Sequence, residues 1–159
     1  MSKSYHMPGW RIAYAAGNSR MIDALAHLKT YTDYGTFMPV QYAAAWALDH
    51  ADETVGAIRE LYRGRAHALV TALRDAGWTN IESPGGTMFV WAPIPEALLG
   101  LDSFQVTTKL IEEAGVVVAP GNGFGDAGEG FVRFSLIEDP PRLVEAAERI
   151  GRLLRRVAA

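Results

Sequence analysis

The sequence predicts an α/β protein, with a self-consistent α+β unit from about residue 50 onward. Three observations predict this class. Residues 52–76 and 139–157 repeat apolar side chains at helical spacing. Short β-branched and aromatic runs lie between them, and a glycine-rich segment separates two of these runs. This order favours three or four strands with helices packed on one side. Residues 1–50 do not predict a core of their own.

The first part of the chain predicts one strand and two helices. A Pro-Gly turn signal followed by aromatic and β-branched residues predicts a strand over residues 10–15. Asn18 or Ser19 is available as the N-cap of a helix over residues 21–28. A loop that contains glycine and proline then leads into an alanine-rich helix over residues 40–48.

The middle of the chain predicts a long helix, a hairpin and a shorter helix. The long helix covers residues 52–76, and Gly77 stands where a helix commonly ends in a left-handed residue. Residues 78–82 and 87–91 flank a Ser-Pro-Gly-Gly turn, which is typical of a hairpin with a longer loop. A helix over residues 103–115 follows.

The last part predicts two strands around a loop and a final helix. Residues 116–119 are short and β-branched enough to form a buried strand, and residues 121–130 form a loop rich in glycine. Residues 131–136 are another strand. Asp139 is a favourable N-cap for the last helix, with a proline in its first turn where a missing N–H does no harm.

The composition of the chain excludes several classes of function. The chain has 159 residues, enough for a sizeable core, and a formal net charge of −3. This charge gives no electrostatic reason to expect nucleic acid or an anionic membrane as a partner. The absence of cysteine excludes disulfides and thiolate chemistry. The sequence shows no apolar run as long as a membrane span and no signal core, so we expect a soluble, cytoplasmic protein.

Lys3 and Arg11 form the most informative local pattern. They lie eight residues apart around a Pro-Gly turn and could converge on one anionic small molecule. The planar fork of an arginine suits a phosphate, and a lysine amine with a lowered pKa can form a Schiff base. The spacing alone leaves open that Lys3 is a frayed terminal residue and that Arg11 is an ordinary surface arginine.

Arg133 stands in the middle of a predicted strand, on the same face as Phe131 and Ser135. A guanidinium at such a position needs a carboxylate partner. Two alternatives remain open at this point: an ion pair inside the protein, with Glu138 or Asp139, or the carboxylate of a ligand.

Other motifs carry little chemistry. The glycine-rich segment at residues 121–125 lacks the lysine of a phosphate-binding P-loop, and no dinucleotide-binding fingerprint is present. The four histidines show no metal-ligand spacing, so we expect no metal site. No nucleophile-elbow sequence supports a serine hydrolase.

Five segments together resemble class I/II aminotransferases, the fold-type I pyridoxal-phosphate enzymes. They are residues 2–11, which contain the lysine motif, and residues 33–41, 86–91, 119–125 and 131–138. The combination is similar to the bacterial branch that holds alanine aminotransferases and LL-diaminopimelate-like aminotransferases. The resemblance covers essentially the whole chain.

The resemblance implies a role for four residues. Lys3 matches the lysine that forms the covalent link to pyridoxal 5′-phosphate and moves the proton of the substrate α-carbon. Ser2 and Arg11 match the hydroxyl residue and the arginine that hold the cofactor phosphate. Arg133 matches the arginine that binds the substrate α-carboxylate, which favours a ligand as its partner.

The resemblance also implies a division of the chain. Residues 1–50 match a remnant of the large cofactor-binding domain, and residues 51–159 match the C-terminal small α+β domain. Full family members are more than twice as long. The acid that pairs with the pyridine nitrogen and the ring that stacks on the cofactor belong to the part that precedes the lysine.

The expected reaction is ping-pong transfer of an amino group between an amino acid and a 2-oxo acid, in a homodimer. The loop over residues 34–39 matches a region that lies near the neighbouring subunit's active site in family dimers. The alternative is a catalytically silent fragment that acts only as a folding or association unit. We expect the exposed face of residues 1–50 to cause self-association or poor solubility.

Overall fold

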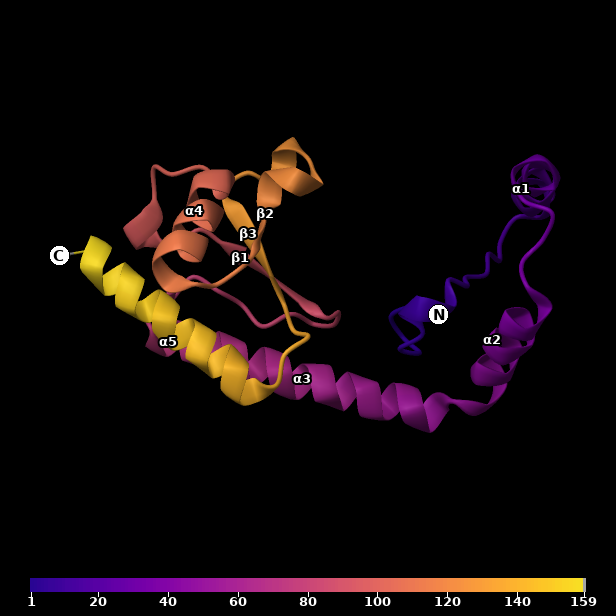
Figure 1. Cartoon of the computed structure of the whole chain (residues 1–159), viewed down its shortest axis with the longest axis horizontal. Coiled ribbons are helices and arrows are strands. Elements are labelled where there is room, and N and C mark those ends of the chain that lie inside the picture. Colours follow the sequence, from indigo (N-terminus) through magenta and orange to yellow (C-terminus); the bar gives the residue numbers. More distant parts are fainter. Residues whose placement is uncertain (159) are drawn as a thin grey trace. The chain divides into compact units, whose positions relative to one another are not determined.

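The computed structural model describes residues 1–158 and divides the chain into two compact units, Met1–Arg59 and Glu60–Ala159. Figure 1 shows their elements, and each unit is described here by itself. The boundary falls within helix α3 (Asp52–Asp75). The division at residue 50 that the resemblance implies concerns the domains of a complete family member, and it stays a prediction.

The first unit contains a short 3-10 turn, η1 (Pro8–Trp10), and helices α1 (Ser19–Thr32) and α2 (Met38–His50). The predicted N-cap is confirmed, because the side chain of Asn18 accepts a hydrogen bond of 3.0 Å from the backbone N–H of Arg20. None of the residues of α1 is buried within the described part of the chain.

The strand predicted over residues 10–15 is wrong. Pro8 begins the 3-10 turn, and the turn ends at Arg11, whose backbone adopts the left-handed conformation with φ 51° and ψ 44°. A strand cannot pass through such a residue. No strand is present elsewhere in the first unit, as far as the structure describes it, to pair with this segment.

The second unit is built on a three-stranded antiparallel sheet in the order β1-β3-β2. The strands are β1 (Phe89–Pro93), β2 (Ala119–Pro120) and the central β3 (Phe131–Ser135). Val90 and Ala92 of β1 and Val132 and Phe134 of β3 face the core. The alternate residues form the opposite face of the sheet.

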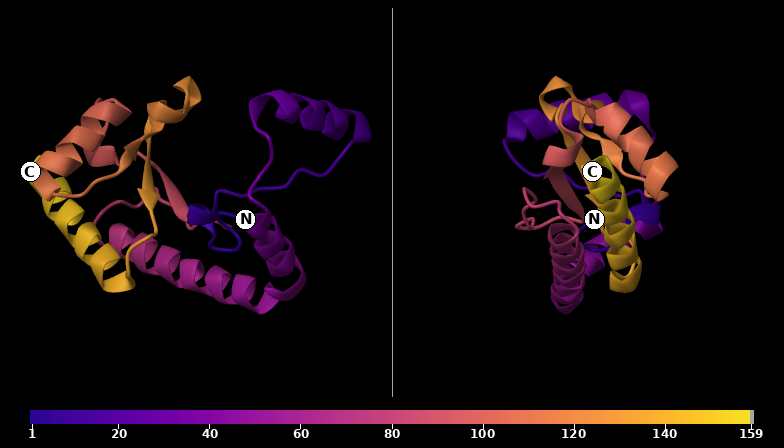
Figure 2. Two further views of the ribbon diagram at one scale, coloured as in Figure 1. Left: turned by 45° about the vertical axis from the view of Figure 1, so that its right-hand side comes forward. Right: turned by 90° about the vertical axis from the view of Figure 1, so that its left-hand side faces the viewer.

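The helices pack on the core face of this sheet. They are α3, α4 (Ser103–Lys109), which a π turn (Leu110–Ala114) extends, and α5 (Pro140–Val157). Their buried apolar residues form one core cluster with the sheet. In the right-hand view of Figure 2, α5 lies beside α3, and a Cβ atom built at Gly151 of α5 would lie 2.7 Å from the Cβ of Ala76. The expected α/β class is confirmed.

The long helix ends where the glycine signal indicates. Gly77 has φ 101°, its N–H donates to the carbonyl of Arg74 at 3.1 Å, and the N–H of Trp78 donates to the carbonyl of Leu73 at 2.9 Å. These two bonds are the Schellman motif that closes a helix at a left-handed residue.

The hairpin predicted between residues 78–82 and 87–91 is wrong, because β1 pairs with β3 instead. Side chains bind the segment after α3 to the rest of the unit. The indole N–H of Trp78 donates to the Pro93 carbonyl at 2.9 Å, and Asn80 donates to the Ile94 carbonyl at 3.1 Å. Arg74 donates to the Ile81 carbonyl at 2.7 Å.

The remaining elements differ from the prediction in detail. The strand expected over residues 116–119 is reduced to β2, although Val116 and Val118 are buried as expected. The glycine-rich loop contains two 3-10 turns, η4 (Gly121–Phe124) and η5 (Asp126–Gly128). Asp139 occupies the N-cap position of α5, but its side chain makes no capping hydrogen bond.

Candidate functional site

The lysine motif forms a compact turn in the first unit. The carbonyl of Lys3 accepts a hydrogen bond from the backbone N–H of His6, and Pro8 then begins the 3-10 turn. The chain bends back at Arg11, so that its Nη1 donates to the Pro8 carbonyl at 3.4 Å. A left-handed conformation at a residue with a Cβ costs roughly 1–2 kcal/mol, and such strain clusters at functional sites.

Lys3 and Arg11 are both exposed, and neither has a carboxylate within ion-pair distance in the described part of the chain. The long bond to Pro8 uses one of the five donors of Arg11. The two cationic groups are therefore available to an anionic ligand. An arginine and a lysine of this kind fit a phosphate group, such as that of pyridoxal phosphate.

Arg133 lies in the central strand of the second unit, with Trp91 of β1 and Ala119 of β2 as its cross-strand neighbours. It is half-buried, on the sheet face that the helices leave uncovered. Its guanidinium lies over two aromatic rings, 4.0 Å from the ring centroid of Phe89 and 4.2 Å from that of Phe124. Both distances are typical of cation–π contacts.

Further aromatic residues contact the rings beside Arg133. The indole ring of Trp91 meets Phe124 edge to face at 5.6 Å, and it stacks on Phe131, also at 5.6 Å. The guanidinium of Arg133 thus lies at an aromatic surface of the sheet, where its N–H groups could bind a carboxylate.

The internal ion pair considered for Arg133 does not form. Asp139 accepts instead from Nη2 of Arg65 at 2.7 Å, and the same guanidinium donates to the carbonyls of Leu136 and Ile137 at 3.1 Å. Within the described residues, Arg133 makes no ion pair with Glu138 or with any other carboxylate. The guanidinium of Arg133 therefore remains available to a carboxylate from outside this part of the chain.

A hydrogen-bonded acid lies behind the loop that carries Phe124. Glu129 accepts from the backbone N–H groups of Ser103 at 2.7 Å and Gly130 at 2.8 Å, and from the Ser103 hydroxyl at 3.0 Å. The N–H of Gly130, and then that of Ser103, hold the pKa of the Glu129 carboxyl below its usual value.

The predicted residues thus form two sets. Ser2, Lys3 and Arg11 belong to the first unit, and Arg133 belongs to the second. Each set is described within its own unit. The sequence prediction missed the rings of Phe89 and Phe124 beside Arg133. Phe89 and Trp91 stand at alternate positions of one strand and Phe131 and Arg133 at alternate positions of another, and this spacing could have indicated an aromatic face beside Arg133.

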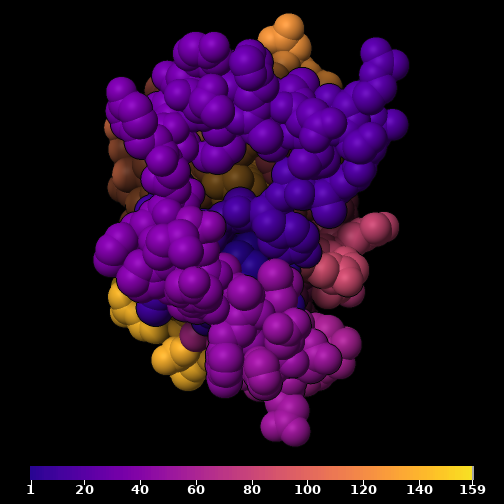
Figure 3. All heavy atoms as spheres, turned by 90° about the vertical axis from the view of Figure 1, so that its right-hand side faces the viewer, coloured from indigo at the N-terminus to yellow at the C-terminus, as the bar shows by residue number. Residues whose placement is uncertain are grey.

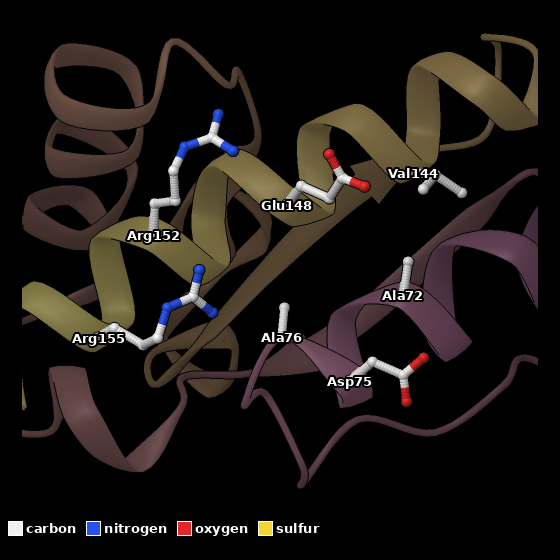
Figure 4. Close-up of a pocket in the computed structure, with 7 residues that line it drawn as sticks. All are labelled: Ala72, Asp75, Ala76, Val144, Glu148, Arg152 and Arg155. Atoms are coloured by element: carbon white, nitrogen blue, oxygen red, sulfur yellow. The ribbon is translucent and has the colours of Figure 1, made fainter.

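A shallow groove of about 400 Å³ between α3 and α5 contains none of these residues (Figure 4). Its charged side chains are two acids and two arginines, and they balance one another. It is lined by Ala72, Asp75, Ala76, Val144, Glu148, Arg152 and Arg155.

Two searches of the described residues gave negative results. No cluster of three or more histidine, aspartate or glutamate side chains could hold a metal ion. None of the described helices is long and apolar enough to cross a membrane.

Comparison with solved structures defines the class of protein. The chain superposes on substrate-bound BacF from Bacillus subtilis with a TM-score of 0.88 and 34% sequence identity, over 96% of this chain and 38% of that one. An aminotransferase from Staphylococcus aureus gives a TM-score of 0.87 and 35% identity, over 98% of this chain and 40% of that one. An aromatic aminotransferase from Pyrococcus horikoshii gives a TM-score of 0.89 and 32% identity, over 98% of this chain and 41% of that one.

The sequence matches the aminotransferase class I and II family over residues 1–150, and the chain belongs to this family. It is 46% identical to the glutamate-pyruvate aminotransferase AlaC of Escherichia coli, over 98% of this chain and 37% of the relative. It is 44% identical to the LL-diaminopimelate aminotransferase of Desulforudis audaxviator, over 99% and 39%. The family resemblance noted in the sequence is confirmed.

The chain spans less than two fifths of the length of these two relatives. Enzymes of this family generally use pyridoxal phosphate. The reaction steps that this chain supports are therefore proposed below.

Proposed function

We propose that this chain is the part of a pyridoxal-phosphate-dependent aminotransferase that supplies the reactive lysine, an arginine for the cofactor phosphate and an arginine for the substrate carboxylate. The observation that carries the proposal is the state of Arg133. It is a half-buried guanidinium on a central strand, held between two aromatic rings, and it has no acid partner in the described chain. A bound carboxylate completes it.

Each proposed residue has a distinct task. Arg133 binds both oxygens of the substrate α-carboxylate and so fixes the orientation of the α-carbon. Nζ of Lys3 accepts the proton from that carbon and later returns it. Ser2 and Arg11 hold the phosphate of the cofactor. Pyridoxal phosphate supplies the electron sink for the bond that breaks at the α-carbon.

The proposed substrates are an amino acid and a 2-oxo acid. The names of the relatives suggest alanine, glutamate and LL-diaminopimelate as the first amino acids to test. The proposed assembly is a homodimer, in which the segment over residues 34–39 lies near the partner's active site. The proposed location is the cytoplasm.

The second candidate is a silent chain that only folds or associates, and the surface of the first unit favours it. Ala44 and Ala47 are its buried apolar residues, whereas many large apolar side chains are exposed. Figure 3 shows atoms of the first unit in indigo to purple. The exposed residues include Trp10, Tyr14, Met21, Tyr31, Tyr34, Phe37, Tyr42 and Trp46.

Such a surface favours association with another polypeptide. An activity test must therefore include both the chain alone and the chain with a polypeptide that can cover this surface.

The test measures amino-group transfer with pyridoxal phosphate, one of the three amino acids and a 2-oxo acid acceptor. It is run with the chain alone and with a polypeptide that carries the upstream portion of the E. coli relative. We expect transfer that is lost in Lys3→Ala and reduced in Arg133→Lys, and that is unchanged in the surface control Arg152→Lys. Association in gel filtration without transfer in either sample would establish the silent chain instead.

A further inference from the structure

The position of Arg133 depends on a loop that is distant from it in the sequence. One of the two rings against its guanidinium, Phe124, belongs to the 3-10 turn η4 rather than to the sheet. Half of the ring of Phe124 is exposed to solvent, so packing against the core does not hold it. Whatever fixes η4 therefore also fixes one wall of the Arg133 site.

A backbone contact between two glycines closes this loop. A Cβ atom built at Gly121 would lie 2.0 Å from the carbonyl oxygen of Gly128, and one built at Gly128 would lie 2.1 Å from that of Gly121. Both residues are buried. The two ends of the loop touch without any side chain between them, so they cannot hold their register by side-chain packing.

Glu129 supplies the missing attachment. It directly follows the second glycine, and its Oε1 accepts from the N–H groups of Ser103 and Gly130. Its Oε2 accepts from the Ser103 hydroxyl at 3.0 Å, and that hydroxyl oxygen in turn accepts from the backbone N–H of Asn122 at 3.3 Å. Asn122 is the second residue of η4, two positions before Phe124.

A continuous set of contacts thus joins this carboxylate to Arg133. It passes from Glu129 through the fully buried Ser103 to Asn122, and then from Phe124 to the guanidinium. Hydrogen bonds from backbone N–H groups to a carboxylate are charge-assisted, and they are stronger than hydrogen bonds between neutral groups. A loop of small residues held this way keeps one conformation.

We propose that Glu129 is a positioning residue for Arg133: its carboxylate fixes the loop that carries Phe124, and so holds the guanidinium ready for a substrate carboxylate. The readiness of Arg133 for a substrate carboxylate rests on the carboxylate-binding role proposed above. The effect of Glu129 on the position of Arg133 does not rest on that role, because it concerns the protein without ligand.

The first measurement reads the position of Arg133 directly. Two aromatic rings at 4.0 and 4.2 Å impose ring-current shifts on the side-chain protons of Arg133. We compare the NMR signals of these protons in the whole chain and in Glu129→Ala, and we use the indole N–H of the buried Trp78 to show that the second unit is folded. We expect the ring-current shift to fall in Glu129→Ala while the Trp78 signal stays.

Two further variants keep this measurement decisive. Asp126→Ala removes an exposed acid of the same loop whose side chain makes no hydrogen bond within the described chain, and it should leave Arg133 unchanged. If Glu129→Ala does not fold, Ser103→Ala cuts the link from Glu129 to Asn122 while the N–H of Ser103 still donates. It should lower the shift in part. An unchanged shift in every folded variant of Glu129 or Ser103 would overturn the positioning role.

The second measurement is a titration with 2-oxoglutarate, followed through the same signals. Loss of one preorganised side chain should weaken binding about three- to tenfold in Glu129→Ala, and Asp126→Ala should bind like the wild type. The titration also separates the two proposals. Equal affinity in the wild type and in Arg133→Lys would refute the carboxylate role of Arg133, while the ring-current result would still decide the role of Glu129.

Discussion

Replacement of Gly121 by alanine should destabilise the second unit strongly, because the added methyl group has no space. The new Cβ would lie 2.0 Å from the carbonyl oxygen of Gly128 and 2.6 Å from that of Phe131. Both obstacles are backbone atoms, so no side chain can rotate away. Either the loop separates from the start of β3, or the strand itself moves.

The size of this effect follows from the cost of overpacking, which is about 1–3 kcal/mol and occasionally more. We expect about 3 kcal/mol here, because the clash involves two carbonyl groups at once. The assay is urea unfolding followed by tryptophan fluorescence. Trp78 is fully buried, whereas Trp10, Trp46 and Trp91 are at least 40% exposed, so the blue-shifted emission reports mainly on the second unit.

Gly123→Ala is the matched control. Gly123 belongs to the same 3-10 turn, and a Cβ built there meets no atom within 4 Å. Its free energy of unfolding should stay within about 0.5 kcal/mol of the wild type. A Gly121→Ala chain as stable as this control would refute the close contact between the two glycines, and with it the loop geometry on which the position of Phe124 depends.

Three further predictions concern the second unit. Gly77→Ala should lower the free energy of unfolding by about 1–2 kcal/mol, because Gly77 adopts a left-handed conformation with φ 101°. Gly64→Ala, at an exposed position inside α3, should raise it by about 0.5–1 kcal/mol. Equal stabilities of the two variants in urea unfolding would contradict the left-handed end of α3. Arg65→Ala should destabilise by about 2–3 kcal/mol, since it leaves two carbonyls and Asp139 without their donor, and Arg63→Ala, an exposed arginine two positions earlier in α3, is the control. The folded-state pKa of Glu129 is lowered, so its stabilisation is present above the unfolded pKa of about 4.3 and is lost as pH falls through the folded value. The difference in stability between the wild type and Glu129→Gln should therefore be constant from pH 7 to about 5 and shrink below about pH 4.3; a difference that grows on acidification would contradict it.

Helix ends were predictable from the sequence because their signals are local. Asn18 caps α1 through its own side chain, and Gly77 closes α3 with two hydrogen bonds to the preceding turn. Both depend on residues within a few positions of one another. The expected family followed from motifs of the same kind, in which residue types recur at short spacing.

Strand pairing was not predictable, because it depends on residues distant in the sequence. Residues 78–82 have a strand-like composition, yet the indole of Trp78 bonds to Pro93 and its segment does not join the sheet. The true partner of β1 lies some forty residues further along the chain. The aromatic setting of Arg133 went unrecognised for a similar reason: Phe89 meets it through that strand pairing and Phe124 through the loop before β3, and both contacts depend on the folded chain.

The sequence allowed us to predict which residues belong to the candidate site, but it did not allow us to predict which other residues surround them. The choice between an internal acid and a ligand as the partner of Arg133 required knowledge of Asp139, which bonds to Arg65. The role proposed for Glu129 could not have been read from its sequence position, because it arises from contact with Ser103, 26 residues earlier.

The central claim is that Lys3 is the reactive lysine of a cofactor site, and borohydride trapping tests it most directly. The whole chain is incubated with pyridoxal phosphate, reduced, digested and mapped across its three lysines. Lys29 pairs with Asp33 at 2.7 Å and Lys109 pairs with Glu113, whereas Lys3 has no acid partner in the described chain. The account predicts modification concentrated on Lys3 and much reduced in Arg11→Ala. Equal, weak modification of Lys3, Lys29 and Lys109 would contradict it.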